Sequence, residues 1–91
     1  MANALKVRAF IAEIAGRPNN VTEDEIRWVV DQLANLGVET SRDGNDHQVM
    51  YTVEGEQFGI CTHHKGAKQI KRCYVKAFLT AMSNTGWYED D

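Results

Sequence analysis

Two adjacent histidines and five of the chain's ten basic residues lie close together, between residues 62 and 76. The basic residues are Lys65, Lys68, Lys71, Arg72 and Lys76. No aspartate or glutamate occurs between Gln57 and Tyr88, although the whole chain has a net charge of -3. The two signs of charge are therefore separated along the sequence. A positive surface on an acidic chain indicates a polyanionic partner, and we predict that this surface binds RNA.

The two histidines, His63 and His64, fall at the end of a predicted strand. Neighbouring strand residues point to opposite faces of a sheet, so only one of the two can join the basic surface. The basic residues follow near the start of a predicted helix, where free backbone N-H groups also attract phosphate. We predict that the five basic residues form the nucleic-acid site, with His63 and His64 as further candidates of which one joins the basic surface. The competing interpretation is a solvated cationic helix face without a nucleic-acid partner.

His47 is the candidate catalytic residue, beside a turn of polar residues at 43–46. Cleavage of RNA through its 2′-hydroxyl needs a group that exchanges a proton near neutral pH, and an unperturbed imidazole does so. Asp43 and Asp46 could orient such a base, although Asp and Asn are common in any turn. The alternative is that His47 is only an exposed polar residue at a strand start.

Cys61, His63, His64 and Cys73 are close enough in sequence for a zinc site to be weighed. Zinc sites usually have ligand pairs in both halves, and here the second half offers only Cys73. Both cysteines fall at apolar positions, which favours buried thiols. No metal or other cofactor is predicted. No secretory signal is readable, so the cytoplasm is the predicted location and a disulfide is not expected.

The elements that must position these residues follow from the hydrophobic periodicity. Apolar residues recur at helical spacing over residues 3–15, and the breaker residues 16–20 follow them. Thr22 and Glu25 have the capping-box pattern, which predicts the start of a second helix. That helix ends at Gly37, where a left-handed residue is expected.

Beyond Gly37 the apolar residues alternate with polar ones, which is the spacing of β-strands. Residues 38–42, 48–53 and 57–62 predict a meander of three antiparallel strands. A final helix is predicted from about Lys68 to Ser83. Its apolar face would hold Ile70, Cys73, Ala77, Phe78 and Ala81, and its basic stripe would hold Lys68, Arg72 and Lys76. Trp87 and Tyr88 are expected to fold back on the core.

Composition indicates one small domain over residues 1–91. The chain is 43% hydrophobic and 25% charged, which suits a single core. Its apolar runs are far shorter than the roughly 18 to 20 residues that cross a bilayer, so no membrane partner is predicted. The predicted fold class is α+β.

The order helix, three strands, helix over residues 22–85 resembles the double-stranded-RNA-binding fold and, more closely, the small HicA-type mRNA interferases built on it. The matching text is residues 36–42, then Gly44-Asn45-Asp46-His47-Gln48, then residues 60–66 and the helix after them. The family has Gly-Ser-His-His near the second stretch and a proline before the second histidine, where this chain has Thr62 or His63. The resemblance implies an α-β-β-β-α core with an extra N-terminal helix. It also implies metal-independent RNA cleavage by His47, with phosphates held by Lys65, Lys68 and Arg72, and an antitoxin-like protein partner.

A non-enzymatic interaction protein, such as an accessory protein of a phage or mobile element, is the alternative function. Acidic residues gathered at Glu23, Glu25, Asp31 and Glu39 would repel nucleic acid over part of the surface. Trp28 would then contact a protein partner, or it would merely cover the first helix. Salt dependence separates the two functions, because phosphate contacts are far more sensitive to salt than an apolar interface.

Overall fold

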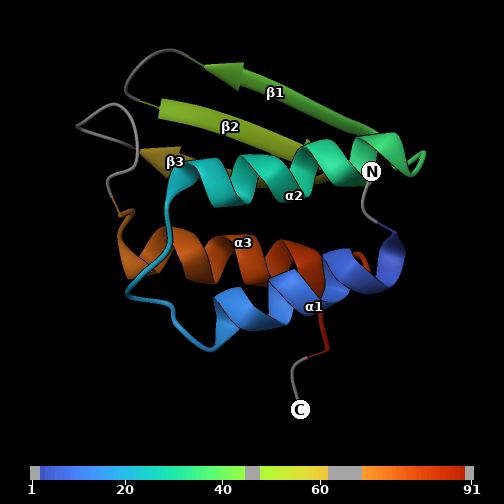
Figure 1. The fold of residues 1–91 in the computed structure, drawn as a ribbon. Coiled ribbons are helices and arrows are strands. Elements are labelled where there is room, and N and C mark those ends of the chain that lie inside the picture. The colour runs from blue at the N-terminus through green and yellow to red at the C-terminus, as the bar shows by residue number, and fades with distance from the viewer. Residues whose placement is uncertain (1–2, 45–47, 62–68, 90–91) are drawn as a thin grey trace.

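The computed structural model describes residues 3–44, 48–61 and 69–89, and its element order is the one that the periodicity predicts (Figure 1). The described elements are α1 (Ala4–Ala15), α2 (Glu23–Asn35), β1 (Thr40–Gly44), β2 (Gln48–Val53), β3 (Glu56–Cys61) and α3 (Arg72–Asn84). The strands form one antiparallel sheet in the order β1-β2-β3. The protein therefore has an α+β fold.

The helices pack on one face of the sheet. α2 contacts β1, α3 packs along β3, and α1 contacts both α2 and α3 (Figure 1). The strand residues that face the helices are all buried, and they are Val49, Tyr51, Val53, Phe58 and Ile60. This alternation with exposed or half-buried neighbours is the pattern of a sheet with one covered face.

Aromatic rings connect the sheet to α3. Tyr51 and Phe58 are cross-strand partners, and their rings stack at 5.3 Å between centroids. Phe78 of α3 meets Phe58 edge-on at 5.4 Å. Tyr51 and Phe78 are fully buried, and Phe58 nearly so. This column of rings fixes α3, and with it the basic residues at its start, against β3.

The two N-terminal helices follow the predicted boundaries closely. Thr22 and Glu25 form the predicted capping box, and Gly37 takes a positive φ of 93° after α2. Trp28 packs against Phe10 of α1, with ring centroids 4.9 Å apart. Trp28 thus covers the first helix, which was one of its two predicted roles. Trp87 also packs on the core, as expected.

The start of the last helix differs from the prediction. α3 begins at Arg72, with Lys71 as its extended N-cap residue, and not near Lys68. The Ile70 N-H donates to the Val21 carbonyl at 2.8 Å, which holds the backbone before Lys71 in a bridge and keeps it out of the helix. The predicted four-residue stripe therefore retains only Arg72 and Lys76 on the described helix.

Cys73 is exposed, so the prediction of a buried thiol at this position was wrong. The buried residues of α3 are Val75, Phe78, Ala81 and Met82. A helix that begins at Arg72 and buries this face turns Cys73 outward in its first turn. Cys61, at the end of β3, is half-buried, and both thiols are free.

Candidate functional site

Three of the predicted nucleic-acid-binding residues lie in the described part of the chain. Lys71, Arg72 and Lys76 are all exposed, at the N-cap and in the first two turns of α3. The first turn of α3 contains no acidic residue, and none of the three cations forms an ion pair with another described residue. We call these three residues the α3 basic surface. Its charge is available to an external anion.

The other predicted site residues lie outside the described residues. They are His47, His63, His64, Lys65 and Lys68. The catalytic function of His47 therefore stays a prediction, and so does the expectation that the cysteines and histidines form no zinc site. Within residues 3–44, 48–61 and 69–89, no three histidine, cysteine or acidic side chains gather as a cation site. No helix in these ranges is both long and apolar enough to cross a bilayer.

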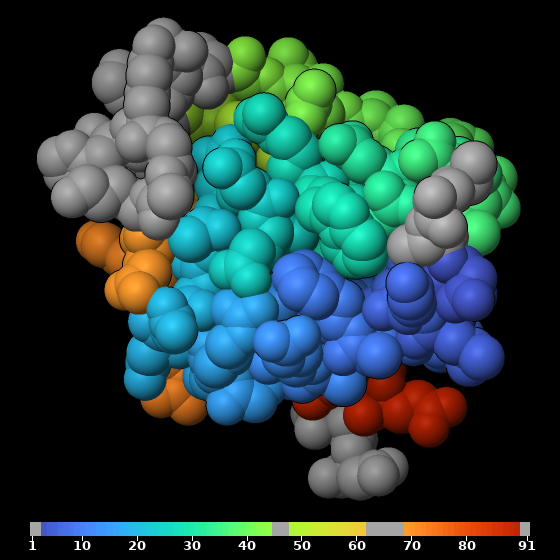
Figure 2. All heavy atoms as spheres, in the orientation of Figure 1, coloured from blue at the N-terminus to red at the C-terminus, as the bar shows by residue number. Residues whose placement is uncertain are grey.

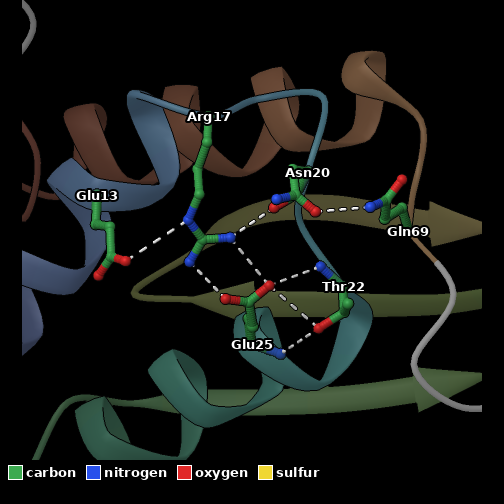
Figure 3. Close-up of polar contacts among 6 residues, drawn as sticks. All are labelled: Glu13, Arg17, Asn20, Thr22, Glu25 and Gln69. Carbon is green, nitrogen blue, oxygen red and sulfur yellow. Dashed lines mark hydrogen bonds and ion pairs between the residues drawn. The ribbon is translucent and has the colours of Figure 1, made fainter.

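The connection between α1 and α2 holds the segment that leads into α3. Gln69 Nε2 donates to Asn20 Oδ1 at 2.6 Å (Figure 3). Ile70 N donates to the Val21 carbonyl. An isolated antiparallel bridge pairs Thr22 with Gln69. In Figure 2 the orange start of α3 accordingly lies beside the light-blue α1–α2 connection. This contact places the α3 basic surface next to the end of α1.

Arg17 organises the same connection (Figure 3). Its Nη2 lies 2.5 Å from Glu25 Oε2, its Nη1 donates to the Asn20 carbonyl at 2.5 Å, and its Nε lies 3.7 Å from Glu13 Oε1. Only about a quarter of the Arg17 and Glu25 side chains is exposed, at 25% and 26%. The hydrogen bond from Arg17 is the main cause that lowers the pKa of Glu25, and the same bond raises the pKa of Arg17. Arg17 is therefore a structural cation.

We predict that Glu25→Gln destabilises the fold at neutral pH and not in acid. Glutamine at this position keeps the capping-box geometry but removes the charge, so the variant isolates the ion pair. We expect a loss of about 1 kcal/mol at pH 7. Because the folded-state pKa of Glu25 lies below its ordinary value of 4.5, the stabilisation is present above pH 4.5 and is lost as the pH falls through the folded-state pKa.

Urea unfolding of both proteins across this pH range measures the difference. Glu13→Gln is the matched control, because the Glu13 side chain is 61% exposed and its contact with Arg17 is longer. It should change the free energy of unfolding by no more than about 0.5 kcal/mol. An equal cost of Glu25→Gln at pH 7 and at strongly acidic pH would show that the charge is not what stabilises this connection.

A hollow of about 510 Å³ lies between the end of α1 and α3. Its lining residues are Ala15, Pro18, Arg72, Cys73, Lys76 and Leu79. A second hollow of about 210 Å³ continues along α3 and shares Lys76 and Leu79 with the first. It is also lined by Thr80, Ser83, Asn84 and Tyr88. Two members of the α3 basic surface thus line a partly apolar groove.

The sequence predicted the basic residues of this groove but not its apolar lining residues. Pro18 was interpreted only as a helix breaker, and Leu79 carried no functional signal. The two residues are far apart in sequence, and they come together because α1 packs on α3 and the α1–α2 connection contacts Gln69. No local pattern reports such a contact.

The end of β3 also lies against the start of α3. Interaction with the Cys61 thiol is the main cause that raises the pKa of Tyr74, and Cys73 contributes to the same shift. The phenol of Tyr74 is thus close to the last residue of the sheet. This neighbourhood ties the first turn of α3 to the strand as well as to the α1–α2 connection.

Comparison of the chain with protein-family models, with curated proteins and with solved structures finds no match. The interpretation of the site therefore depends on its own geometry and charge.

Proposed function

We propose that this domain binds RNA through the α3 basic surface. The observation that carries the proposal is the exposure of Lys71, Arg72 and Lys76 together at one helix end, without an ion-pair partner among the described residues. Cations without compensation attract phosphate and release counterions when they bind it. The sequence adds four further lysine or histidine residues just before Gln69, with no acidic residue among them.

We propose further that the part from α2 to α3 is an α-β-β-β-α core of the double-stranded-RNA-binding type. The order of its elements supports this, as does the packing of α2 and α3 on one face of the sheet. α1 is then an addition to that core. Folds of this type recognise RNA mainly through its shape, its phosphates and its 2′-hydroxyls, which suits a surface of flexible cations.

The charge balance of the α1–α2 connection also favours an anionic partner at α3. Glu25 is the acidic residue of the Thr22 capping box, and its carboxylate is neutralised by Arg17. A second acidic residue, Glu23, pairs with Arg27 at 3.1 Å. The acidic start of α2 therefore carries less uncompensated charge than its sequence suggests.

The test is a gel-shift titration of the purified protein with labelled single- and double-stranded RNA at about 50 mM and 200 mM salt. If three phosphates are neutralised, affinity should fall roughly 20- to 40-fold between the two conditions, since each contact contributes about 0.7 to 0.9 to the log-log slope. Absence of RNA binding at both salt concentrations would overturn the proposal and move the interpretation to a protein partner.

The same gel tests the RNA cleavage that the HicA-type resemblance implies. Cleavage by the wild-type protein that is lost in His47→Ala, with binding retained, would assign interferase activity to this domain. Binding without cleavage by the wild-type protein would leave an RNA-binding domain. Because His47 and the α3 basic surface are separate in sequence, His47→Ala tests cleavage, whereas substitution of Arg72 and Lys76 tests binding.

A further inference from the structure

The groove beside α3 is built partly from the extra N-terminal helix. Ala15 is the last residue of α1 and Pro18 lies in the connection after it, whereas Arg72, Lys76 and Leu79 belong to α3. The resemblance to RNA-binding folds covers only α2 to α3. Any ligand of this groove would therefore contact a wall that the resembling core does not supply.

The first hollow combines carbon-rich walls with two cations. Ala15, Pro18 and Leu79 provide apolar surface, and the sequence spacing of Arg72 and Lys76 places them on one side of the helix. No acidic residue is among its described lining residues. Its volume of about 510 Å³ lies within the usual range of small-ligand pockets. The chemistry fits a flat, mainly apolar ring that carries a phosphate.

The lining of the second hollow favours a nucleotide over an apolar anion such as a fatty acid. Its lining adds the hydrogen-bonding side chains Thr80, Ser83 and Asn84 and the aromatic ring of Tyr88. Thr80 Oγ1 already donates to the Lys76 carbonyl and Asn84 Nδ2 to Glu56 Oε1, but a fatty acyl chain could use none of the remaining donors and acceptors. The sugar and base edges of a nucleic-acid strand could use them. Aromatic rings beside a cationic groove are typical of surfaces that bind single strands.

We propose that the first hollow binds one nucleoside monophosphate unit of an unpaired RNA strand. Arg72 and Lys76 hold the phosphate, and the base lies against Pro18 and Leu79. The inference rests on the proposed RNA-binding function and narrows its substrate to RNA with unpaired residues. A base inside a duplex is stacked and paired, so it cannot enter a hollow of this kind without first leaving the helix.

The exposed Cys73 thiol lines the hollow and supplies a reporter for the test. In a Cys61→Ala background it is the chain's one remaining thiol. Its alkylation by iodoacetamide is followed with a single-stranded oligoribonucleotide, with a blunt duplex at equal occupancy, and with AMP alone. Since only free protein reacts, nine-tenths occupancy by the single strand should slow alkylation about tenfold. The duplex should slow alkylation less than the single strand does, because it can reach the same cations from outside while no base enters the hollow.

Leu79→Gln gives a second measurement. It should weaken binding of the single strand about tenfold through lost base contact, without altering the salt slope that the phosphates produce. Leu5→Gln is the matched control, because Leu5 is 77% exposed on α1 and is not among the lining residues. Circular dichroism and urea unfolding establish that both variants are folded.

The outcomes separate the two proposals. Failure of both RNAs to bind overturns the proposed function and this inference together. Equal binding of single strand and duplex, with Cys73 protected equally by both or by neither, overturns this inference and leaves RNA binding through the α3 basic surface intact. Protection by the single strand supports the inference, and protection by AMP as well identifies the free nucleotide as a ligand of the same hollow.

Discussion

Arg72→Gln/Lys76→Gln should weaken RNA binding about 100-fold at about 50 mM salt, if each cation makes one charge-assisted contact worth roughly tenfold. Both side chains are exposed on α3, and glutamine is nearly as good a helix former as arginine or lysine, so the fold should persist. The slope of log affinity against log salt should become shallower by about 1.4 to 1.8, because two phosphates lose their contacts. Gel-shift titrations at several salt concentrations give both quantities.

A control of equal charge distinguishes a local surface from overall charge. Lys6→Gln/Arg42→Gln also removes two exposed cations, from α1 and β1, and leaves the α3 basic surface unchanged. It should alter RNA affinity by less than about threefold, the change expected from weak, screened, long-range attraction. An equal loss in both double variants would show that RNA responds to net charge and would remove the argument for a site on α3.

The elements that could be predicted are those specified by neighbouring residues. The capping box needs only Thr22 and Glu25, and β2 needs only the alternation of residues 48–53. The start of α3 could not be predicted in this way. Helical propensity allows a helix from Lys68, but the bond from Ile70 N to the Val21 carbonyl takes the preceding backbone out of helical geometry. A contact across some fifty residues of sequence overrides a local preference.

The candidate site also has a part that neighbouring residues specify and a part that only tertiary contacts specify. Charge is a property of composition, so the basic residues of α3 could be found from the sequence. The hollow beside them depends on Pro18, Leu79 and the folded α1–α2 connection, which no periodicity describes. The exposure of Cys73 was missed for a different reason: at about 100° per residue, Cys73 lies about 140° around the helix from the buried Phe78, so the predicted apolar face was wrong at this position. Sequence thus locates the charge, and tertiary contacts determine the shape of the surface that carries it.

Phe78→Ala should have the largest effect on stability, a loss of about 3 to 5 kcal/mol. Phe78 is fully buried, and its ring meets Phe58 edge-on at 5.4 Å, so truncation leaves a cavity between α3 and β3. A chain of this size is stable by only about 5 to 15 kcal/mol, so a large part of that margin would be lost. Thermal unfolding should shift down by roughly 15 to 30 °C, measured by circular dichroism.

Tyr51→Phe is the control for Phe78→Ala, because it keeps a ring in the same aromatic column. The Tyr51 hydroxyl is buried without a hydrogen-bond partner among the described residues. The phenol still raises the pKa of Arg27, but their geometry falls short of a hydrogen bond. Removing an unsatisfied hydroxyl should leave stability unchanged or raise it by about 1 kcal/mol. If Phe78→Ala costs as little as Tyr51→Phe, packing of α3 on β3 does not hold the α3 basic surface in place, and the cations would need another support.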